Sequence, residues 1–368
     1  MSKVLILGGG LAGAAAAKEL TAGGMPALIV EATGALGGKA RAYGCKATDK
    51  CNNCGVCLMS GLWATVENNA LAEIRLNTRL VDLVGVNGAY TAALKSGGAT
   101  EYVDGISKVI VATGFERTTR ENYNGFVEII TGDDAVSSSM TMGSDAAPSS
   151  IIMNSGAGSS SIIMGSDIER IMRERGESHL FDKPPGNVAF IQCYGSRDRR
   201  DNADHCSRVC CAYSSRAAKV IKEYYPDCGL TFFYMEMQQV MSGDYFDEIK
   251  RLGVNFVKCR PVKVTDGNPA HVIFDNPETG KRESLAFDIV VLSDGIRPAE
   301  GAARVAELCG LGQNEAGFLR YVTGPSDADS TGVYLAGCAG GAAKIEETYN
   351  ESIAVARRIL FQKERGAS

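Results

Sequence analysis

The sequence predicts an α/β protein in which a second α/β unit is inserted into a discontinuous first unit. A strand, a glycine-rich turn, a helix and another strand follow one another over residues 3–30. A second alternation of strands and helices begins at Asn187, and the strand at 289–292 leads the chain back to the first unit. The length of 368 residues is sufficient for two such domains.

The first elements form a βαβ unit of the kind that binds dinucleotides. Apolar strands are expected at 3–7 and 27–30, on either side of an alanine-rich helix. Gly8, Gly10 and Gly13 lie where the chain must turn tightly, approach a pyrophosphate and pack the helix against the strand. The free N–H groups and the positive dipole end of the helix favour phosphate there.

An acidic residue stands where a ribose would be bound. Glu31 ends the second strand, 18 residues after Gly13. Its carboxylate is placed to accept hydrogen bonds from ribose hydroxyls, which favours an unphosphorylated ribose. The alternative is a glycine-rich turn without a ligand.

Three further motifs carry a family resemblance. They read GALGGKAR at 34–41, VIVATGF at 109–115 and GVYLAGC at 332–338. In this order they resemble the two-dinucleotide-binding-domain flavoproteins of thioredoxin reductase-like fold, which implies FAD as the cofactor. The residues assigned to FAD by the turn and by this resemblance are Gly8, Gly10, Leu11, Ala12, Gly13, Glu31, Ala32, Gly38, Lys39, Arg41, Ala112, Thr113, Gly114, Gly337, Cys338 and Ile345.

The inserted unit lacks the second glycine fingerprint that such reductases use for NAD(P)H. The corresponding loop reads IQCYGSRDRRDNADHCSRVCC and carries Cys193, Cys206, Cys210 and Cys211. Four thiolates spaced C-x12-C-x3-C-C favour a [4Fe-4S] cluster. Zinc is the main alternative, because four thiolates also bind it tetrahedrally. Buried or disulfide-forming cysteines are the third.

The cysteine loop carries a second, closer resemblance. IQCYGSRD followed by CSRVCC, together with the tail GCAGGAAKIEETYNESIAVA, resembles the flavin subunit of heterodisulfide reductase, HdrA. The resemblance implies a [4Fe-4S] cluster on the four cysteines beside FAD, a homodimer, and HdrB- and HdrC-like partner subunits. Because two ferredoxin-type cysteine runs of the methanogen proteins are absent from this sequence, it looks like the short form found in complexes of sulfur oxidisers or in other HdrA-containing electron-transfer assemblies.

This resemblance predicts an electron-transfer subunit that passes electrons between flavin and cluster. One alternative is a self-contained FAD- and NAD(P)H-dependent disulfide oxidoreductase, and another is a non-catalytic scaffold that holds cofactors. Arg216 stands where methanogen relatives commonly present a lysine near the flavin, so electron bifurcation is not carried over. Lys344 is expected to face the flavin pyrimidine ring. A solvated helix face is the alternative for Arg216.

A further cysteine group lies near the N-terminus. Cys51, Cys54 and Cys57 form C-x2-C-x2-C, with Cys45 six residues before the first, but Gly61 stands at the fourth ferredoxin position. A second cluster, a redox thiol pair and a structural or interface role all remain open for this group.

Composition sets the domain limits and excludes several functions. The predicted parts are the first FAD-binding segment at 1–136, a Ser/Gly/Met-rich connection at 137–166, the inserted α/β domain at 167–297 and the second FAD-binding segment at 298–368. A net charge of −5 argues against nucleic acid, and no apolar run is long enough for a membrane helix. Twelve cysteines without an export signal predict a cytoplasmic protein with few disulfides.

Overall fold

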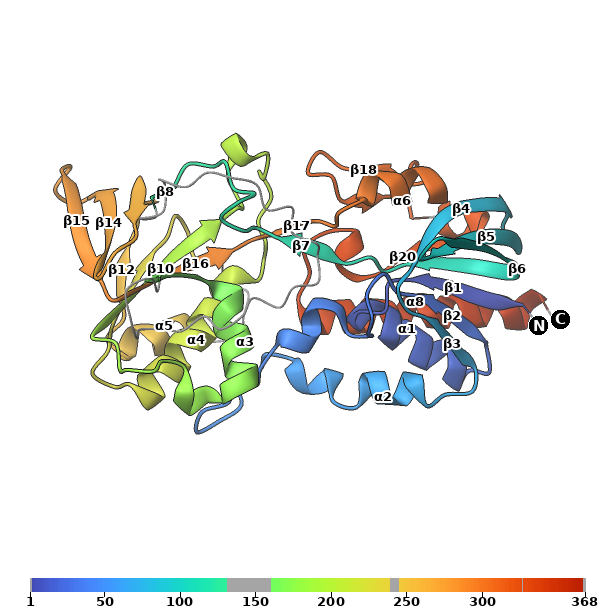
Figure 1. Cartoon of the computed structure of the whole chain (residues 1–368), viewed down its shortest axis with the longest axis horizontal. Helices are drawn as coiled ribbons and strands as arrows, with labels where there is room; N and C mark the ends of the chain where they lie inside the picture. The colour runs from blue at the N-terminus through green and yellow to red at the C-terminus, as the bar shows by residue number, and fades with distance from the viewer. Residues whose placement is uncertain (1, 131–159, 239–244, 326, 367–368) are drawn as a thin grey trace. The chain divides into compact units, whose positions relative to one another are not determined.

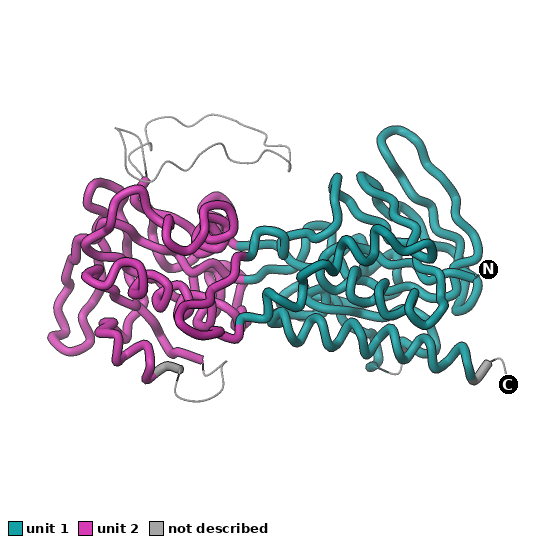
Figure 2. Tube along the Cα trace, turned by 90° about the horizontal axis from the view of Figure 1, so that it is seen from below, with its two compact units in different colours: residues 1–43, 54–117, 296–368 teal, residues 44–53, 118–295 magenta. Residues whose placement is uncertain are grey.

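The computed structural model describes residues 2–130, 160–238, 245–325 and 327–366 (Figure 1). The chain divides into two compact units (Figure 2). Unit 1 comprises Met1–Tyr43, Cys54–Arg117 and Ile296–Ser368, and unit 2 comprises Gly44–Asn53 and Thr118–Gly295. The expected insertion of a second α/β unit into a discontinuous first one is confirmed, and a ten-residue segment near the N-terminus also joins unit 2.

Unit 1 is built around one mixed sheet and has two small two-stranded sheets besides it. The strands of unit 1 are β1 Lys3–Leu7, β2 Ala27–Val30, β3 Ala72–Arg75, β4 Thr78–Val86, β5 Ala89–Ser96, β6 Ala99–Val111, β7 Phe115–Arg117, β17 Ile296–Pro298, β18 Gly312–Gln313, β19 Leu319–Arg320 and β20 Val333–Leu335. Seven of them form a sheet in the order β3-β2-β1-β6-β5-β4, with β20 also paired to β6. β1, β2, β3 and β20 pair in parallel, whereas β4, β5 and the first half of β6 form an antiparallel meander.

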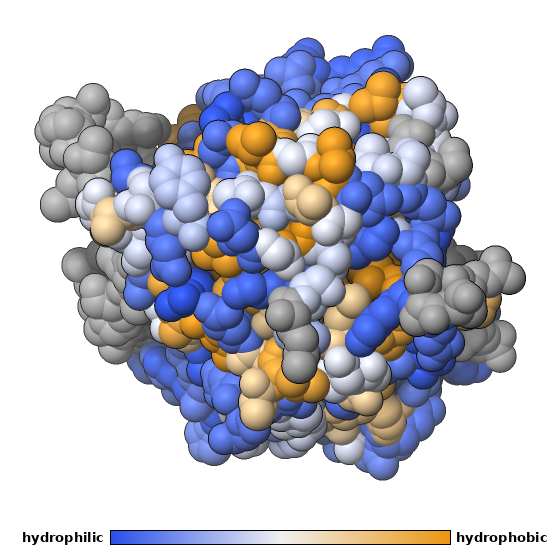
Figure 3. All heavy atoms as spheres, turned by 90° about the vertical axis from the view of Figure 1, so that its right-hand side faces the viewer, coloured by the Kyte–Doolittle hydropathy of each residue, from blue (hydrophilic) through white to orange (hydrophobic). Residues whose placement is uncertain are grey.

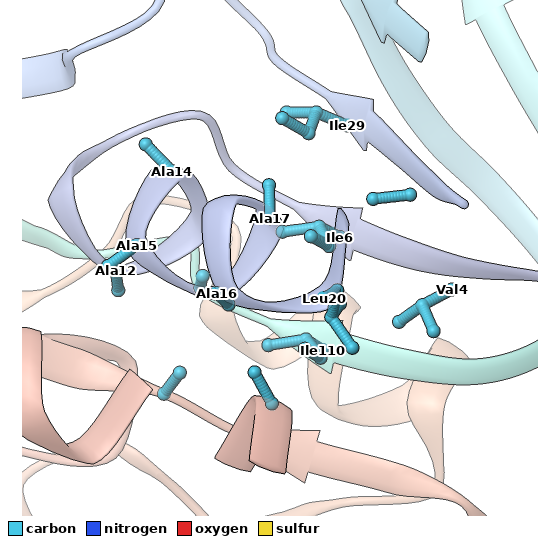
Figure 4. Packing of buried hydrophobic residues seen from close by; sticks show 14 of the residues in the cluster. Val4, Ile6, Ala12, Ala14, Ala15, Ala16, Ala17, Leu20, Ile29 and Ile110 are labelled. Atoms are coloured by element: carbon cyan, nitrogen blue, oxygen red, sulfur yellow. The ribbon is translucent and has the colours of Figure 1, made fainter. Parts of the chain in front are cut away.

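The helices of unit 1 bury small residues against this sheet. They are α1 Leu11–Ala22, α2 Leu62–Glu67, α6 Ala302–Cys309, α7 Asp327–Thr331 and α8 Ile345–Gly366, with 3-10 turns η1 Gly38–Ala42, η2 Val56–Met59 and η5 Gly337–Ala339. Four consecutive alanines, 14–17, are fully or almost fully buried in α1. They lie close to Ile6, Ile29 and Ile110 of the strands (Figure 4). Because alanine has no bulk beyond Cβ, the helix comes close to the sheet and brings its N-terminus to the end of β1.

Unit 2 contains a parallel sheet and a small mixed sheet. Its elements are β8 Glu128–Ile130, β9 Ile162–Met164, α3 Gly165–Arg175, η3 Glu177–His179, β10 Asn187–Tyr194, η4 Arg199–Asp201, α4 Cys210–Tyr224, β11 Gly229–Phe233, α5 Tyr245–Arg251, β12 Asn255–Val257, β13 Lys263–Thr265, β14 Ala270–Asp275, β15 Arg282–Phe287 and β16 Ile289–Asp294. The parallel sheet has the order β12-β11-β10-β16-β9, and the other has the order β15-β14-β13-β8. The central strands β10 and β16 are buried along nearly their whole length.

The connection predicted at 137–166 differs at its end from the structure. Residues 131–159 lie outside the described part of the chain. Ile162–Met164 form β9 and pair with Val290–Leu292 of β16, so this end belongs to the sheet. β9 is an edge strand whose two adjacent isoleucines are buried. The Ser/Gly/Met-rich composition around them obscured this short strand.

The surface of unit 1 mixes residue types. The face shown in Figure 3 carries hydrophobic residues in separate groups among hydrophilic ones. Among the described helices, none combines the length and the apolar character that crossing a bilayer requires.

Candidate dinucleotide cradle and cysteine site

The glycine turn after β1 is shaped by close backbone approaches. Gly8 has φ +103°, and a Cβ on it would lie 2.4 Å from the carbonyl oxygen of Ala112. A Cβ on Gly13 would lie 1.9 Å from the carbonyl oxygen of Gly8. Around Gly10, in contrast, a Cβ would meet no atom within 4 Å. The turn is therefore closed on the protein side and open at the N-terminus of α1, where Leu11 and Ala12 begin the helix.

Glu31 fixes this turn from the end of β2. Its side chain is buried, and Oε2 accepts a hydrogen bond of 2.7 Å from the Gly9 N–H. Oε1 accepts hydrogen bonds of 2.8 Å from the N–H and the hydroxyl of Thr33. Ala32 next to it is exposed. A carboxylate held beside the open helix end is suited to the ribose of a dinucleotide.

The GALGGKAR motif at 34–41, which leads into η1, is hydrogen-bonded to the same glycine turn. The Gly37 N–H donates to the carbonyl oxygen of Gly9 at 2.8 Å, and a Cβ on Gly38 would lie 3.5 Å from the Cα of Gly10. Lys39 Nζ forms an ion pair of 3.0 Å with Glu116. Arg41 lies on the same turn and is exposed.

The ATG turn after β6 contains a polar atom that the described residues do not satisfy. The N–H of Ala112 donates to the carbonyl oxygen of Leu7 at 2.8 Å, which holds the turn beside β1. Gly114 has φ +73°. The Thr113 hydroxyl is buried and has no hydrogen-bond partner among the described residues. Buried hydroxyls are normally paired, so this one fits the place of a bound group.

The GVYLAGC motif at 332–338 lies before α8 and leads into η5. Gly337 lies in η5 with φ +64°, and a Cβ on it would lie 2.9 Å from the Cβ of Ala12. Its N–H donates to Glu351 Oε2 at 2.8 Å. Burial raises the pKa of Glu351, and this carboxyl, which the sequence did not single out, holds the turn against α8.

Two other predicted residues near α8 have modest contacts. The Cys338 thiol is buried and donates to the carbonyl oxygen of Ala343 at 3.6 Å. The backbone N–H of Lys344 donates to Glu347 Oε2, directly before Ile345 starts α8. All the residues predicted to bind FAD thus lie in unit 1, and most of them come from turns that contact the glycine turn or α1. Their close approaches, open helix end and orphaned hydroxyl fit a dinucleotide.

The four loop cysteines are brought together at the start of α4 in unit 2. Cys193 lies near the end of β10, with φ +60°, and Cys210 and Cys211 begin α4. Cys193, Cys210 and Cys211 are buried, and Cys206 is partly exposed. Hydrogen bonds to Cys193 and Cys211 raise the pKa of Cys210 well above its ordinary value. The Cys210 hydrogen bond in turn lowers the pKa of Cys193 to about 7.

Cys206, the fourth cysteine of the loop, interacts with the other cysteines through their charges. Burial raises the pKa of Cys206, and the charges of Cys193 and Cys211 act in the same direction. Within the described residues, no three His, Cys, Asp or Glu side chains already surround a common ion position. Four neighbouring soft donors nevertheless fit a thiolate-held metal group, either an iron–sulfur cluster or zinc.

The loop between these cysteines is held by a buried charge network. Asp198 Oδ2 accepts hydrogen bonds from the Tyr123 hydroxyl at 2.9 Å and the Phe126 N–H at 2.8 Å. Arg260 Nη1 lies 3.3 Å from the same oxygen, and Arg260 Nη2 donates to the carbonyl oxygens of Ser196 and Arg197. No sequence motif pointed to Arg260, because its role arises only when β12 and β10 share a sheet.

Arg216 makes contacts that the sequence did not predict. Its guanidinium donates to the carbonyl oxygens of Asn52 at 2.8 Å and Asn53 at 2.6 Å. On the next turn of α4, Lys219 Nζ donates to Asn52 Oδ1 at 2.8 Å. These contacts of Arg216 hold the segment 44–53. A role for Arg216 toward a flavin stays a prediction.

The N-terminal cysteine group is divided between the units. Cys45 and Cys51 belong to unit 2, whereas Cys54 and Cys57 belong to unit 1. Cys45, Cys51 and Cys57 are exposed, and Cys54 is partly exposed.

Comparison with known proteins identifies similar chains. No protein-family model matches the sequence. The HdrA protein of the ferredoxin/F420H2-dependent CoB-CoM heterodisulfide reductase of Methanosarcina acetivorans is 26% identical over 97% of this chain and 52% of its own length. The HdrA protein of the H2:CoB-CoM heterodisulfide, ferredoxin reductase of Methanothermobacter thermautotrophicus is 31% identical over 55% of this chain and 33% of its own. The chain spans about half the length, or less, of these curated relatives.

Solved structures confirm the fold class. Thioredoxin reductase from T. acidophilum superposes with a TM-score of 0.59 at 16% identity, covering 98% of both chains. The Lactococcus lactis thioredoxin reductase gives 0.58 at 14% identity, again over 98% of both chains. At these identities the likeness concerns the fold alone. The curated relatives confirm the resemblance to HdrA of heterodisulfide reductase.

Proposed function

From its likeness to HdrA, we propose that this chain is an FAD- and [4Fe-4S]-containing electron-transfer subunit of a heterodisulfide reductase-like complex. The observation that carries the proposal is the gathering of four thiols at the start of α4. The equivalent place in unit 1, the start of α1, follows a glycine turn that is open at Gly10, where a phosphate could bind. One unit is thus fitted for a nucleotide and the other for a thiolate-held redox centre.

Each unit has a defined part in this function. When bound, FAD supplies exchange of one or two electrons, and the cluster takes electrons singly. Gly8, Gly13 and Glu31 shape the nucleotide cradle, and Thr113 offers its buried hydroxyl to the bound group. In unit 2, Cys193, Cys206, Cys210 and Cys211 would hold the cluster.

The proposal extends to partners and setting. We propose HdrB- and HdrC-like subunits as partners, a homodimer of this chain, and sulfane oxidation as the pathway, on the resemblance of the cysteine loop and the tail to HdrA-like proteins. Free thiols in this number suit a reducing compartment, so we place the protein in the cytoplasm.

The test is an anaerobic preparation assayed for iron, sulfide and FAD per chain. We expect about four irons and one FAD, with a reducible EPR signal. Cys210→Ala should lose most of the iron and keep FAD. The matched control is Cys228→Ala, which removes another buried cysteine of unit 2, one whose thiol contacts the carbonyl oxygen of Gly229.

Two results would contradict the proposal. Wild-type chains with zinc or no metal would exclude the electron-transfer role, and iron retained in Cys210→Ala would exclude the ligand assignment. The fold likeness to thioredoxin reductase supports one alternative, a self-contained NAD(P)H-dependent disulfide oxidoreductase. Rapid reduction of the bound flavin by NADH would support that alternative.

A further inference from the structure

We infer that Arg197 provides a fixed positive charge and a buried N–H donor to the four-cysteine site, and that it raises the reduction potential of the cluster held there. The inference rests on the proposed function, since it assigns a role toward the proposed cluster. It concerns a residue that lies between Cys193 and Cys206 but is not one of the ligands.

The backbone N–H and the backbone carbonyl of Arg197 are both hydrogen-bonded. It has φ +54°, a left-handed conformation that an arginine rarely adopts. Its N–H donates to the carbonyl oxygen of His205 at 2.9 Å, and its own carbonyl accepts from Arg260 Nη2 at 3.1 Å. These contacts fix the direction in which the side chain leaves the loop.

The side chain acts on the cysteines. Arg197 makes a hydrogen bond to the Cys193 thiol, and its charge acts on the same sulfur. The same charge acts on Cys206 and Cys211. Arg197 therefore contacts one of the four sulfurs and lies within electrostatic reach of two others.

One end of the guanidinium has no acceptor in the described protein. Nη1 of Arg197 is buried without a hydrogen-bond partner there, whereas Nη2 lies 3.5 Å from Glu236, whose side chain is 67% exposed. A buried cationic donor is stable only when something accepts its hydrogen bond. Thiolate or sulfide sulfur of a cluster would supply that acceptor.

The neighbouring charges do not cancel this effect. Arg260, another cation near Cys193, is paired with the buried Asp198. Glu236 is largely in water, so its charge is screened. Reduction adds one negative charge to a cluster, and a nearby fixed cation and N–H donor stabilise that reduced state.

The experiment is a reductive titration of the anaerobic full-length protein, followed by EPR of the cluster, with iron and sulfide assayed in the same samples. Arg197→Gln should keep its iron. At the wild-type midpoint its ratio of reduced to oxidised cluster should fall about tenfold, the size expected for one charged hydrogen bond. Arg197→Lys, which keeps the charge, should show a smaller decrease.

The matched control is Arg199→Gln on the same loop. The Arg199 side chain is 90% exposed and lies 3.4 Å from Asp204, so its removal should leave the midpoint unchanged. An unchanged midpoint in Arg197→Gln, or an equal shift in Arg199→Gln, would overturn the inference. Loss of iron from Arg197→Gln would also overturn it, because a tuning residue is not needed to hold the cluster. Wild-type protein without iron would instead refute the proposed function itself.

Discussion

Two glycines of the unit 1 turn are required for different physical reasons. Gly8 has both a left-handed backbone and a carbonyl oxygen 2.4 Å from where its Cβ would lie. Gly13 has an ordinary helical backbone, and only the 1.9 Å approach to the Gly8 carbonyl oxygen forbids a side chain. A substitution at Gly13 therefore isolates the packing of α1 against the turn from backbone strain.

Gly13→Ala should reduce the bound FAD at least tenfold. A methyl group there must push α1 away from the end of β1, and this displaces the N–H groups that would contact the pyrophosphate. The measurement is flavin released per folded chain, with circular dichroism to confirm folding. Gly98→Ala is the control, because its Cβ would meet nothing within 4 Å and should leave FAD content unchanged. Full FAD content in Gly13→Ala would exclude this turn as the cradle.

For single residues, the sequence predicts a role when the residues that create the constraint are neighbours in the chain. The spacing of Gly8, Gly10 and Gly13 predicts the turn because adjacent residues create the constraint. Arg216 shows the limit, because its partners at 52 and 53 lie far away in the sequence and no pattern joins them. Arg260 was missed for the same reason.

Among the elements, the segment 44–53 depends on a buried ion pair. Lys46 Nζ lies 2.5 Å from Glu169 Oε2, with side-chain exposures of 4% and 8%. The segment is also tied to α4 through Asn52. The side chain of Asn52 in turn donates to the Lys46 carbonyl oxygen at 2.5 Å. A short segment without regular structure is thereby fixed to α3 and α4.

Lys46→Met should lower the free energy of unfolding of unit 2 by about 3 kcal/mol, because it leaves the Glu169 carboxylate buried without its partner. Lys46→Met combined with Glu169→Leu should recover most of the loss. Urea denaturation checks the stability, and hydrogen exchange of 44–53 checks the local effect. Lys50→Met is the control, since Lys50 is 58% exposed and an ion pair in water, such as its pair with Glu248, should contribute little. Equal effects at both lysines would contradict the assignment.

The loop between the ligand cysteines depends on Asp198. Burial tends to raise the pKa of Asp198, but hydrogen bonds from the Phe126 N–H and the Tyr123 hydroxyl and the charge of Arg260 outweigh it. The net pKa lies below the ordinary 3.8. A carboxyl with a depressed folded-state pKa contributes stability above its unfolded-state pKa and loses it as the pH falls through the folded value.

Asp198→Asn should therefore cost about 2 kcal/mol of stability at neutral pH, because charged hydrogen bonds are lost. The difference from wild type should stay constant between about pH 7 and pH 5 and narrow only below about pH 4. Thermal melting at several pH values measures it. Asp204→Asn, at a side chain 67% exposed on the same loop, should change little. A difference that varies near pH 6 would assign the effect to another group.

The strands that the sequence predicts are the buried ones. The buried strands β1, β2, β10 and β16 are predicted from their apolar runs and are confirmed. The strands of the meander and of the small mixed sheet were not predicted. β4 and β15 are largely exposed, so their sequences lack a hydrophobic period.

Across the whole molecule, the two units differ at one equivalent place. In unit 1 only residues 8–10 separate β1 from α1, which is the geometry of a phosphate-binding turn. In unit 2 residues 195–209 separate β10 from α4, and α4 starts with two cysteines. The sequence predicted this difference, but it did not predict that 44–53 joins unit 2. That assignment depends on long-range contacts such as the pair of Lys46 and Glu169.

This difference predicts how the flavin is reduced. Without a glycine turn at the head of α4, the described residues of unit 2 lack the usual cradle for the pyrophosphate of a pyridine nucleotide. Anaerobic addition of excess NADH or NADPH should therefore leave the flavin absorbance of the FAD-loaded protein unchanged, whereas dithionite should bleach it.

A thioredoxin reductase assayed with NADPH in parallel serves as the positive control. Prompt bleaching of this protein by NADH would mean that unit 2 binds a pyridine nucleotide despite its cysteines, which favours the self-contained disulfide oxidoreductase. Bleaching by dithionite alone would mean that electrons reach the flavin by another route. The cysteine site of unit 2 is the redox centre that this chain offers for that route, so Cys210→Ala should slow the reduction of the flavin by a protein donor and leave reduction by dithionite intact.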